Sequence, residues 1–260
     1  MKIYSPEQVE NFMDKISIHY DMICKPCSDS RVLFLKKMID KSKSQVPIFV
    51  DLSCSTGETL HSLAKQCRGI FYGIDISQCM INMAIKKNIS NSNTYFLKGD
   101  MRNIADLNLP KVDYIYSNSL EWLSNIDYLN QVVKKAYNIL KPNGYLILDI
   151  INKKKFLEKL KPAYSSYIKN NNRIYLKNTI YRENNNKIVV NQIYSIVTLE
   201  DYQCETIAGE IYFTPISIEQ IKESLVNKYE FLGYETNYGQ EGNDYYQVIC
   251  KKKGKGKGNE

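Results

Sequence analysis

The sequence has no long hydrophobic run and no apolar stretch at its start. No segment approaches the roughly 20 consecutive apolar residues that span a bilayer, and the segment from Met1 to Pro6 lacks the apolar core of a secretion signal. We therefore expect a cytoplasmic protein that does not contact a membrane. Hydrophobic residues still make up 43% of the 260 residues, which is enough to build a folded core.

Cysteine and histidine are too scattered to predict a disulfide framework or a metal site. The seven cysteines make an odd count, and without a secretion signal we expect reduced thiols. Cys24 and Cys27 form the one Cys-x-x-Cys pair, but a structural zinc site usually needs a second ligand pair. A thioredoxin-type motif lies between a strand and a helix, whereas this pair precedes every predicted strand. We expect no metal.

The positive charge is concentrated at the C-terminus. The net charge is +7, and residues 251–260 contain five lysines and one glutamate, so this segment carries +4 and the rest about +3. Its lysine and glycine residues have nothing to bury, which predicts a disordered, solubilising tail. Weak binding to nucleic acid is the alternative interpretation of such a tail, but we do not expect nucleic acid as a partner.

Short apolar strands alternate with helices through the centre of the chain. Strands are predicted at 46–52, 69–75, 94–98, 112–117 and 145–151, with helices at 58–67, 78–87 and 127–140. This alternation predicts right-handed crossovers and a parallel sheet covered on both faces. Two helices, at 6–23 and from about residue 30, are expected before it. After it we expect a helix at 153–160, a hairpin of 173–181 with 188–199, a strand at 207–213, a helix at 217–227, and an antiparallel pair of 229–238 with 245–250.

Small or acidic residues follow three of the predicted strands, where a parallel sheet gathers its strand ends. The turn from Ser53 to Gly57 would offer backbone N–H groups to the polar tail of a nucleoside cofactor. Asp75 follows about 20 residues later, the usual spacing for a carboxylate that accepts from ribose hydroxyls. Asp100 and Met101 would provide the slot and polar edge for the base. The sequence therefore predicts a cofactor-binding enzyme.

These motifs resemble those of the class I S-adenosylmethionine-dependent methyltransferase family. The resemblance rests on the turn after Asp51, on Asp75, on Asp100, on the segment from Ser117 to Trp122, and on the turn from Leu140 to Gly144. It implies a doubly wound α/β fold with a mostly parallel seven-stranded sheet. It also implies S-adenosyl-L-methionine as cofactor and S-adenosyl-L-homocysteine as product.

The first motif departs from the family pattern, because Ser53 and Ser55 replace two of its three glycines. Glycine serves there for a positive φ or for close approach of the backbone. We expect serine to adopt this turn without entering the left-handed region, with a hydroxyl facing the methionyl part of the cofactor. Reduced cofactor affinity is the alternative.

Asn118 and Ser119 ahead of Trp122 are similar to the small-molecule branch of the family, which includes glycine and sugar-amine N-methyltransferases. The likeness implies an N-terminal helical lid (1–45), a cofactor-binding core (46–152), an antiparallel insertion that roofs the substrate site (153–213) and a C-terminal part of the core sheet (214–250), before the tail (251–260).

The resemblance also assigns roles to individual residues. The implied catalytic residues are His19, Tyr20 and Glu121; the cofactor contacts are Tyr20, Asp51, Ser53, Ser55, Gly57, Asp75, Ile76, Met80, Asp100, Met101, Ser117 and Asn118; the substrate contacts are Asn118, Glu121, Trp122, Tyr175 and Tyr212. Structural alternatives stay open: Asp75 could cap a strand, Asp100 could begin a turn, and Tyr20 and Trp122 could be plain core.

We therefore predict methyl transfer to a nitrogen or oxygen of a small metabolite, with an amine favoured, by a monomer or homodimer. An RNA or protein methyltransferase is one alternative. A non-catalytic domain that binds S-adenosylmethionine as a regulatory ligand is another. A nucleotide-dependent dehydrogenase ranks last, because the turn lacks the Gly-x-Gly-x-x-Gly spacing.

Overall fold

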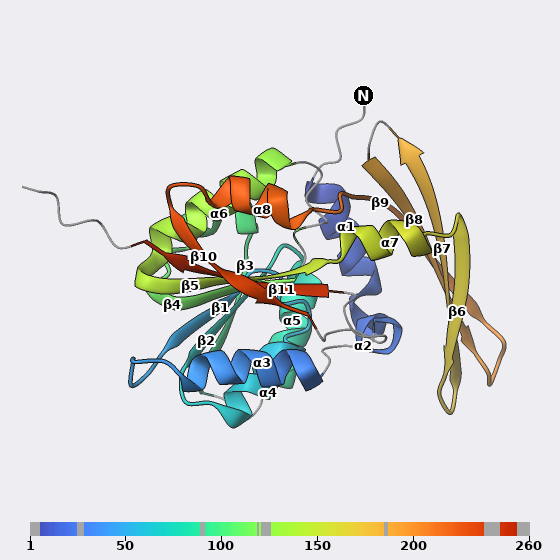
Figure 1. The fold of residues 1–260 in the computed structure, drawn as a ribbon. Helices are drawn as coiled ribbons and strands as arrows, with labels where there is room; N and C mark the ends of the chain where they lie inside the picture. Colours follow the sequence, from blue (N-terminus) through green and yellow to red (C-terminus); the bar gives the residue numbers. More distant parts are fainter. Residues whose placement is uncertain are drawn as a thin grey trace, which may run out of the picture.

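The protein is built from two β-sheets, with the N-terminal helices lying between the strand ends of the first and the second (Figure 1). A computed structural model describes residues 6–24, 29–88, 92–118, 120, 126–184, 187–236 and 245–253. Within these ranges no helix is long and apolar enough to cross a membrane. Likewise, the described residues contain no cluster of three or more histidine, cysteine, aspartate or glutamate side chains able to hold a metal ion.

The central sheet has seven strands in the order β10-β11-β5-β4-β1-β2-β3. Its strands are β1 (Ile48–Asp51), β2 (Ile70–Asp75), β3 (Thr94–Lys98), β4 (Val112–Ser117), β5 (Leu140–Ile151), β10 (Tyr229–Glu235) and β11 (Tyr245–Lys252). The neighbours from β3 to β5 pair in parallel, whereas β11 runs antiparallel to both β5 and β10. The predicted fold class, a mostly parallel seven-stranded sheet with an antiparallel closing pair, is confirmed.

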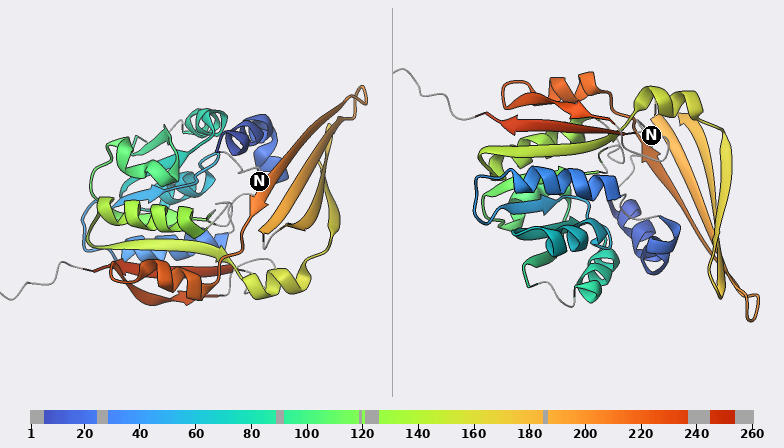
Figure 2. Two further views of the ribbon diagram at one scale, coloured as in Figure 1. Left: turned by 90° about the horizontal axis from the view of Figure 1, so that it is seen from above. Right: turned by 60° about the horizontal axis from the view of Figure 1, so that its bottom comes forward.

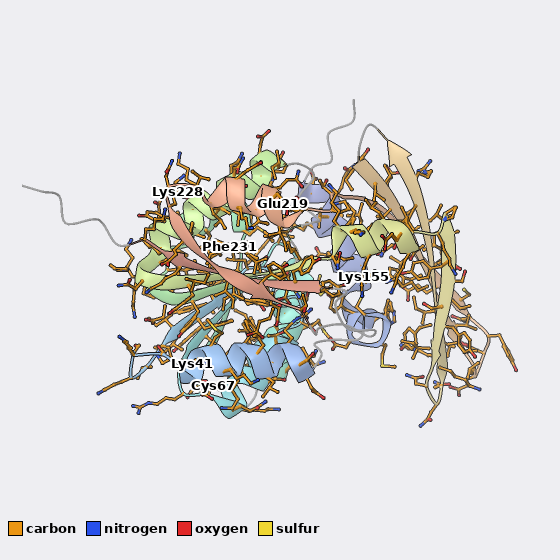
Figure 3. All side chains as sticks on the ribbon, viewed as in Figure 1. Lys41, Cys67, Lys155, Glu219, Lys228 and Phe231 are labelled. Carbon is orange, nitrogen blue, oxygen red and sulfur yellow. The ribbon has the colours of Figure 1, made fainter. Side chains whose placement is uncertain are left out.

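Helices cover both faces of this sheet, which explains why its strands are almost continuously apolar. The helices are α1 (Pro6–Ile16), η1 (Ser17–His19), α2 (Tyr20–Ile23), α3 (Asp29–Asp40), α4 (Glu58–Gln66), α5 (Gln78–Lys87), η2 (Met101–Leu107), α6 (Ile126–Ile139), α7 (Lys153–Lys159) and α8 (Ile218–Leu225). One face packs on α6 and α8, the other on α3, α4 and α5. Side chains fill the layer on both sides, including Cys67, which is buried just after α4 (Figure 3).

The second sheet is antiparallel and stands beside the strand ends of the first (Figure 2). Its strands are β6 (Ala163–Lys169), β7 (Arg173–Asn184), β8 (Lys187–Thr198) and β9 (Cys204–Phe213), in that order. Between the two sheets lies a third apolar cluster, in which Phe12 and Ile16 of α1 pack with Tyr194 and Ile211. This cluster packs the antiparallel insertion against the N-terminal helices.

The structure differs from the sequence-based expectations in several elements, including an unpredicted η2. The helix predicted for 6–23 is interrupted by η1, where the hydroxyl of Ser17 donates to the carbonyl of Asp14 at 2.8 Å. The predicted turn Lys141–Gly144 instead forms an irregularity within β5, with Asn143 at a φ of 64°. Finally, β6 had no predicted counterpart.

Candidate active site

A cavity of about 230 Å³ lies between the strand ends of the central sheet, helices α1 and α2, and the inner face of the antiparallel sheet. Its lining residues are Val9, Met13, Ile16, Tyr20, Cys24, Leu52, Ser53, Ser55, Asp75, Ile76, Met80, Gly99, Asp100, Met101, Arg102, Tyr128, Lys177, Gln192, Tyr194 and Ile211. Residues 53, 75 and 100, far apart in the sequence, therefore converge on one site, as expected for the ends of adjacent parallel strands.

Most backbone N–H groups of the turn after β1 already have hydrogen-bond partners within the protein. The N–H of Ser53 donates to Asp51 Oδ1 at 3.1 Å and that of Ser55 to Asp75 Oδ2 at 2.9 Å, while the N–H groups of Cys54 and Gly57 donate to carbonyls. The contribution of this turn to the cavity therefore comes from Ser53 and Ser55, which line it, more than from the free N–H groups that the sequence analysis expected.

Ser55 occupies the left-handed region, with a φ of 48°. The expectation that serine would avoid this region was wrong for Ser55, which pays a conformational cost that glycine would not. Its hydroxyl donates to the phenol oxygen of Tyr20 at 3.1 Å, so a hydrogen bond to the lid offsets part of the strain. Gly57 also has a positive φ, of 79°, and an added Cβ would lie 2.8 Å from the Phe96 ring.

Asp75 is held rigidly at the end of β2. One carboxylate oxygen accepts from the N–H of Ser55 and the other from the N–H of Ser77 at 3.0 Å. The side chain lines the cavity although the residue is only 9% exposed. Burial raises the pKa of Asp75 to about 6, although the two N–H donors favour the ionised form and lower the pKa in part. The carboxylate is therefore ionised at neutral pH and retains lone pairs for a ligand.

Asp100 forms an ion pair with Arg102 in the wall of the cavity. Its side chain accepts from the backbone N–H of Arg102 at 2.8 Å and begins η2, as the alternative interpretation expected. The Arg102 side chain also bonds both carboxylate oxygens. The guanidinium lies 4.6 Å from the ring centroid of Tyr128. Ion pair and ring together form one wall of the cavity, next to Met101.

The N-terminal helices are fastened to the core by polar contacts on both sides of the cavity. Asp14 accepts from the Ser77 hydroxyl at 2.5 Å and from the Cys79 N–H at 3.1 Å. Asp21 accepts from the Thr56 hydroxyl at 2.5 Å and pairs with the Lys87 ammonium. These contacts place Tyr20 against the turn after β1, where burial raises the pKa of its phenol.

His19 is not among the residues that line the cavity. It is buried, its Nε2 lies 3.1 Å from Glu205 Oε2 on β9, and its ring meets that of Tyr175 edge to face, with centroids 5.7 Å apart. In this arrangement His19 joins the N-terminal helices to the antiparallel sheet. His61, within α4, packs against Phe96, and burial lowers its pKa.

The other predicted site residues divide into three groups. Of the predicted set, Tyr20, Ser53, Ser55, Asp75, Ile76, Met80, Asp100 and Met101 line the cavity. Asp51, Gly57, Ser117, Asn118, Tyr175 and Tyr212 do not line it, although Asn118 Oδ1 accepts from the Ser53 hydroxyl at 2.9 Å. Glu121 and Trp122 lie outside the described residues, as do Ser119 and Cys27.

Several lining residues were missed by sequence reasoning. From the antiparallel sheet these are Lys177, Gln192 and Ile211, and from elsewhere Val9, Met13, Ile16, Cys24, Leu52, Gly99, Arg102 and Tyr128. Alternation along β7 and β8 defines which residues share a face, but it does not reveal which face is turned toward the core. Only Arg102 carried a usable signal, because it follows Asp100 at the spacing of a capped turn.

Comparisons with known proteins agree with this architecture. Residues 49–144 match the family described as "Methyltransferase domain". The chain is 32% identical over 124 residues to the "Putative methyltransferase YqeM" of Bacillus subtilis (strain 168), covering 47% of this chain and 49% of that one. The chain spans about half the length of the curated relatives it matches.

Solved structures match nearly the whole chain at low sequence identity. An S-adenosylmethionine-dependent methyltransferase from Clostridium acetobutylicum ATCC 824 superimposes with a TM-score of 0.73 at 19% identity, covering 93% of this chain and 99% of that one. The sugar N-methyltransferase KedS8 from Streptoalloteichus sp. ATCC 53650 gives 0.71 at 14% identity, covering 91% and 93%. At such identities the likeness establishes the fold.

Residues 49–144 are thus similar to a methyltransferase domain, and nearly the whole chain has the fold of solved S-adenosylmethionine-dependent methyltransferases. The fold that the sequence motifs implied is thereby confirmed, and the similarity to methyltransferases agrees with the resemblance to the class I family. What the site binds and what it methylates follow as proposals from its geometry.

Proposed function

We propose that this protein transfers a methyl group from S-adenosyl-L-methionine to a nitrogen or oxygen of a small molecule, and that an amine is the favoured acceptor. The observation that carries the proposal is the roofed cavity, in which Ser53, Ser55, Asp75 and Asp100 meet at the strand ends of a methyltransferase domain. S-adenosyl-L-homocysteine is the product that this reaction implies.

The residues at the floor of the cavity fit an adenosyl cofactor. The ionised carboxylate of Asp75 suits a pair of ribose hydroxyls, because charged acceptors make the stronger hydrogen bonds. Met80, Met101 and Tyr128 supply apolar and aromatic surface for a base, beside the polar edge of Asp100. Tyr20 and the hydroxyls of Ser53 and Ser55 would face the methionyl portion.

When bound, the cofactor supplies a methyl group that its sulfonium has already activated. The protein's own part is to align the acceptor with that methyl group and exclude water, since orientation alone can contribute several kcal/mol. Among the lining residues that the structure describes there is no histidine. Burial raises the pKa of the Tyr20 and Tyr194 phenols, so both stay protonated and neither is a base at neutral pH. Without an evident base, a neutral amine is a better acceptor than a hydroxyl.

Removing the charge of Asp75 tests the site directly. We expect Asp75→Asn to weaken S-adenosylhomocysteine binding by about ten- to a hundredfold, the value of a hydrogen bond to a charged group, as measured by isothermal titration calorimetry. Asp106→Asn, an exposed carboxylate on η2, is the matched control and should bind normally. Unchanged affinity in Asp75→Asn with intact circular dichroism would remove Asp75 from the cofactor site.

A radiolabelled methyl donor tests the reaction itself. Label should pass from S-adenosylmethionine to small amines in a metabolite extract. Label in RNA or protein instead would support the macromolecular alternative. Tight cofactor binding with no transfer to any acceptor would support the regulatory domain. The basic tail is the feature that suggests an RNA or protein substrate, and its residues 254–260 lie outside the described part of the chain. No specific observation favours either alternative.

A further inference from the structure

The inner face of the antiparallel sheet is mostly apolar, but four adjacent polar side chains interrupt it. Alternation along the strands puts Lys177 and Thr179 of β7 on one face with Gln192 and Tyr194 of β8. The register pairs Lys177 with Tyr194 and Thr179 with Gln192, so the four are adjacent. We call these four residues the roof cluster. Three of its members, Lys177, Gln192 and Tyr194, line the cavity.

Among the described residues, Lys177 is the one cation of the cavity wall that has no carboxylate partner. The charged lining residues are Asp75, Asp100, Arg102 and Lys177. Arg102 pairs with Asp100, and Asp75 accepts two backbone N–H groups. The half-buried Lys177 has its ammonium 5.8 Å from the Tyr194 ring centroid, a weak partner compared with a carboxylate.

The neighbours of Lys177 add hydrogen-bond donors. The Tyr194 hydroxyl donates to Gln192 Oε1 at 2.9 Å, which orients the amide and leaves its NH₂ group for another acceptor. The hydroxyl of Thr179 is fully buried and has no hydrogen-bond partner among the described residues. Thr179 does not line the cavity, so the donors that a ligand can reach are the Lys177 ammonium and the Gln192 amide.

We propose that the methyl acceptor carries an anionic group, a carboxylate or a phosphate, which binds to the roof cluster through Lys177 and Gln192. This inference rests on the proposed methyl transfer and names the substrate class of the same site. The floor of the cavity holds the acidic groups that suit an adenosyl cofactor, and the roof holds the unmatched cation. A partly enclosed site strengthens the attraction between this cation and an anion.

The first test asks which products receive the methyl group. The protein is incubated with S-adenosylmethionine labelled on its methyl group and a small-molecule extract, and the products are applied to an anion exchanger. We expect the labelled products to be retained. Phosphatase treatment of the extract beforehand then separates the two sources, because it abolishes retention of phosphate acceptors and spares carboxylates.

The second test assigns the contact to Lys177. We expect Lys177→Met to raise KM for a retained acceptor by about tenfold or more, the loss of a charge-assisted hydrogen bond, and to leave the Kd for S-adenosylhomocysteine unchanged. Lys177→Arg should restore KM in part. Lys169→Met, an exposed lysine of the edge strand β6, is the matched control. If Lys177→Met does not fold, Lys177→Gln takes its place.

Three results would overturn the inference, and they are distinguishable. Label confined to products that the exchanger does not retain would refute the anionic acceptor alone. Weakened S-adenosylhomocysteine binding in Lys177→Met would show that Lys177 binds the cofactor's own carboxylate. Absence of any labelled product, despite S-adenosylhomocysteine binding, would refute the methyl transfer and this inference with it.

Discussion

Ser55 combines a strained backbone conformation with a side-chain hydrogen bond. It replaces a glycine of the family motif and sits at a φ of 48°, while its hydroxyl reaches Tyr20 on the lid. The sequence showed the substitution but not the backbone conformation, because φ at this position is imposed by the connection from β1 to α4. The N–H of Ser55 itself donates to Asp75 Oδ2, and the N–H of Ser53 donates to Asp51 Oδ1.

We predict that Ser55→Gly is more stable than Ser55→Ala by about 1 kcal/mol, because a non-glycine residue in the left-handed region costs roughly that much. Both variants lose the hydroxyl, so the bond to Tyr20 cancels in the comparison. Urea denaturation measures the difference in the free energy of unfolding. Equal stabilities would mean that the turn holds serine without strain.

At the scale of elements, the N-terminal helices depend on close packing against the antiparallel sheet. Gly209 of β9 faces Phe12 of α1, and an added Cβ would lie 2.2 Å from Phe12 Cδ2 and 2.7 Å from Cγ. The Cγ atom cannot move far without moving the helix. The absence of a side chain at Gly209 is therefore what lets α1 approach the roof of the cavity.

We predict that Gly209→Ala destabilises the protein by about 1–3 kcal/mol, the usual cost of overpacking. Phe12→Ala removes the obstructing ring, so the double variant should lose less stability than the sum of the two single changes. Ala208→Ser, on the exposed face of the same strand, is the control. Strict additivity in thermal or urea denaturation would argue against this contact.

The central strands and helices could be predicted because their signal is local. The helix 78–87 and the strands 94–98 and 112–117 have the predicted bounds, since each carries its own apolar period. Strand β6 could not be predicted, because none of its residues is buried and it is held by backbone pairing to β7. The break at η1 was also missed, because helical periodicity continues through it.

At the scale of the whole molecule, buried carboxyl groups couple stability to pH. Asp51 is 2% exposed, and burial raises its pKa to about 7, opposed by the Ser53 N–H and by Arg31. The unfolded value is about 3.9, so between these two values the folded protein binds more protons than the unfolded chain. The contribution of Asp51 is therefore favourable at low pH and is lost as pH rises toward 7.

We predict that the free energy of unfolding falls as pH rises from about 4 to 7, by up to about 1.4 kcal/mol per pH unit from this one group. Asp51→Asn keeps an acceptor for the Ser53 N–H and should flatten that slope. Urea denaturation at a series of pH values compares the two proteins. The same slope in both would assign the pH dependence to other groups.

The sequence by itself determined the alternation of strands and helices, and with it the class of sheet and the convergence of Asp75 and Asp100 at its edge. These features follow from short-range periodicity and from the geometry common to all parallel sheets. Only the tertiary structure decided which face of the antiparallel insertion closes the cavity. It thereby placed Lys177 and Gln192 at the site and removed His19 from it. Contacts between segments more than 100 residues apart set that choice, and no local pattern encodes them.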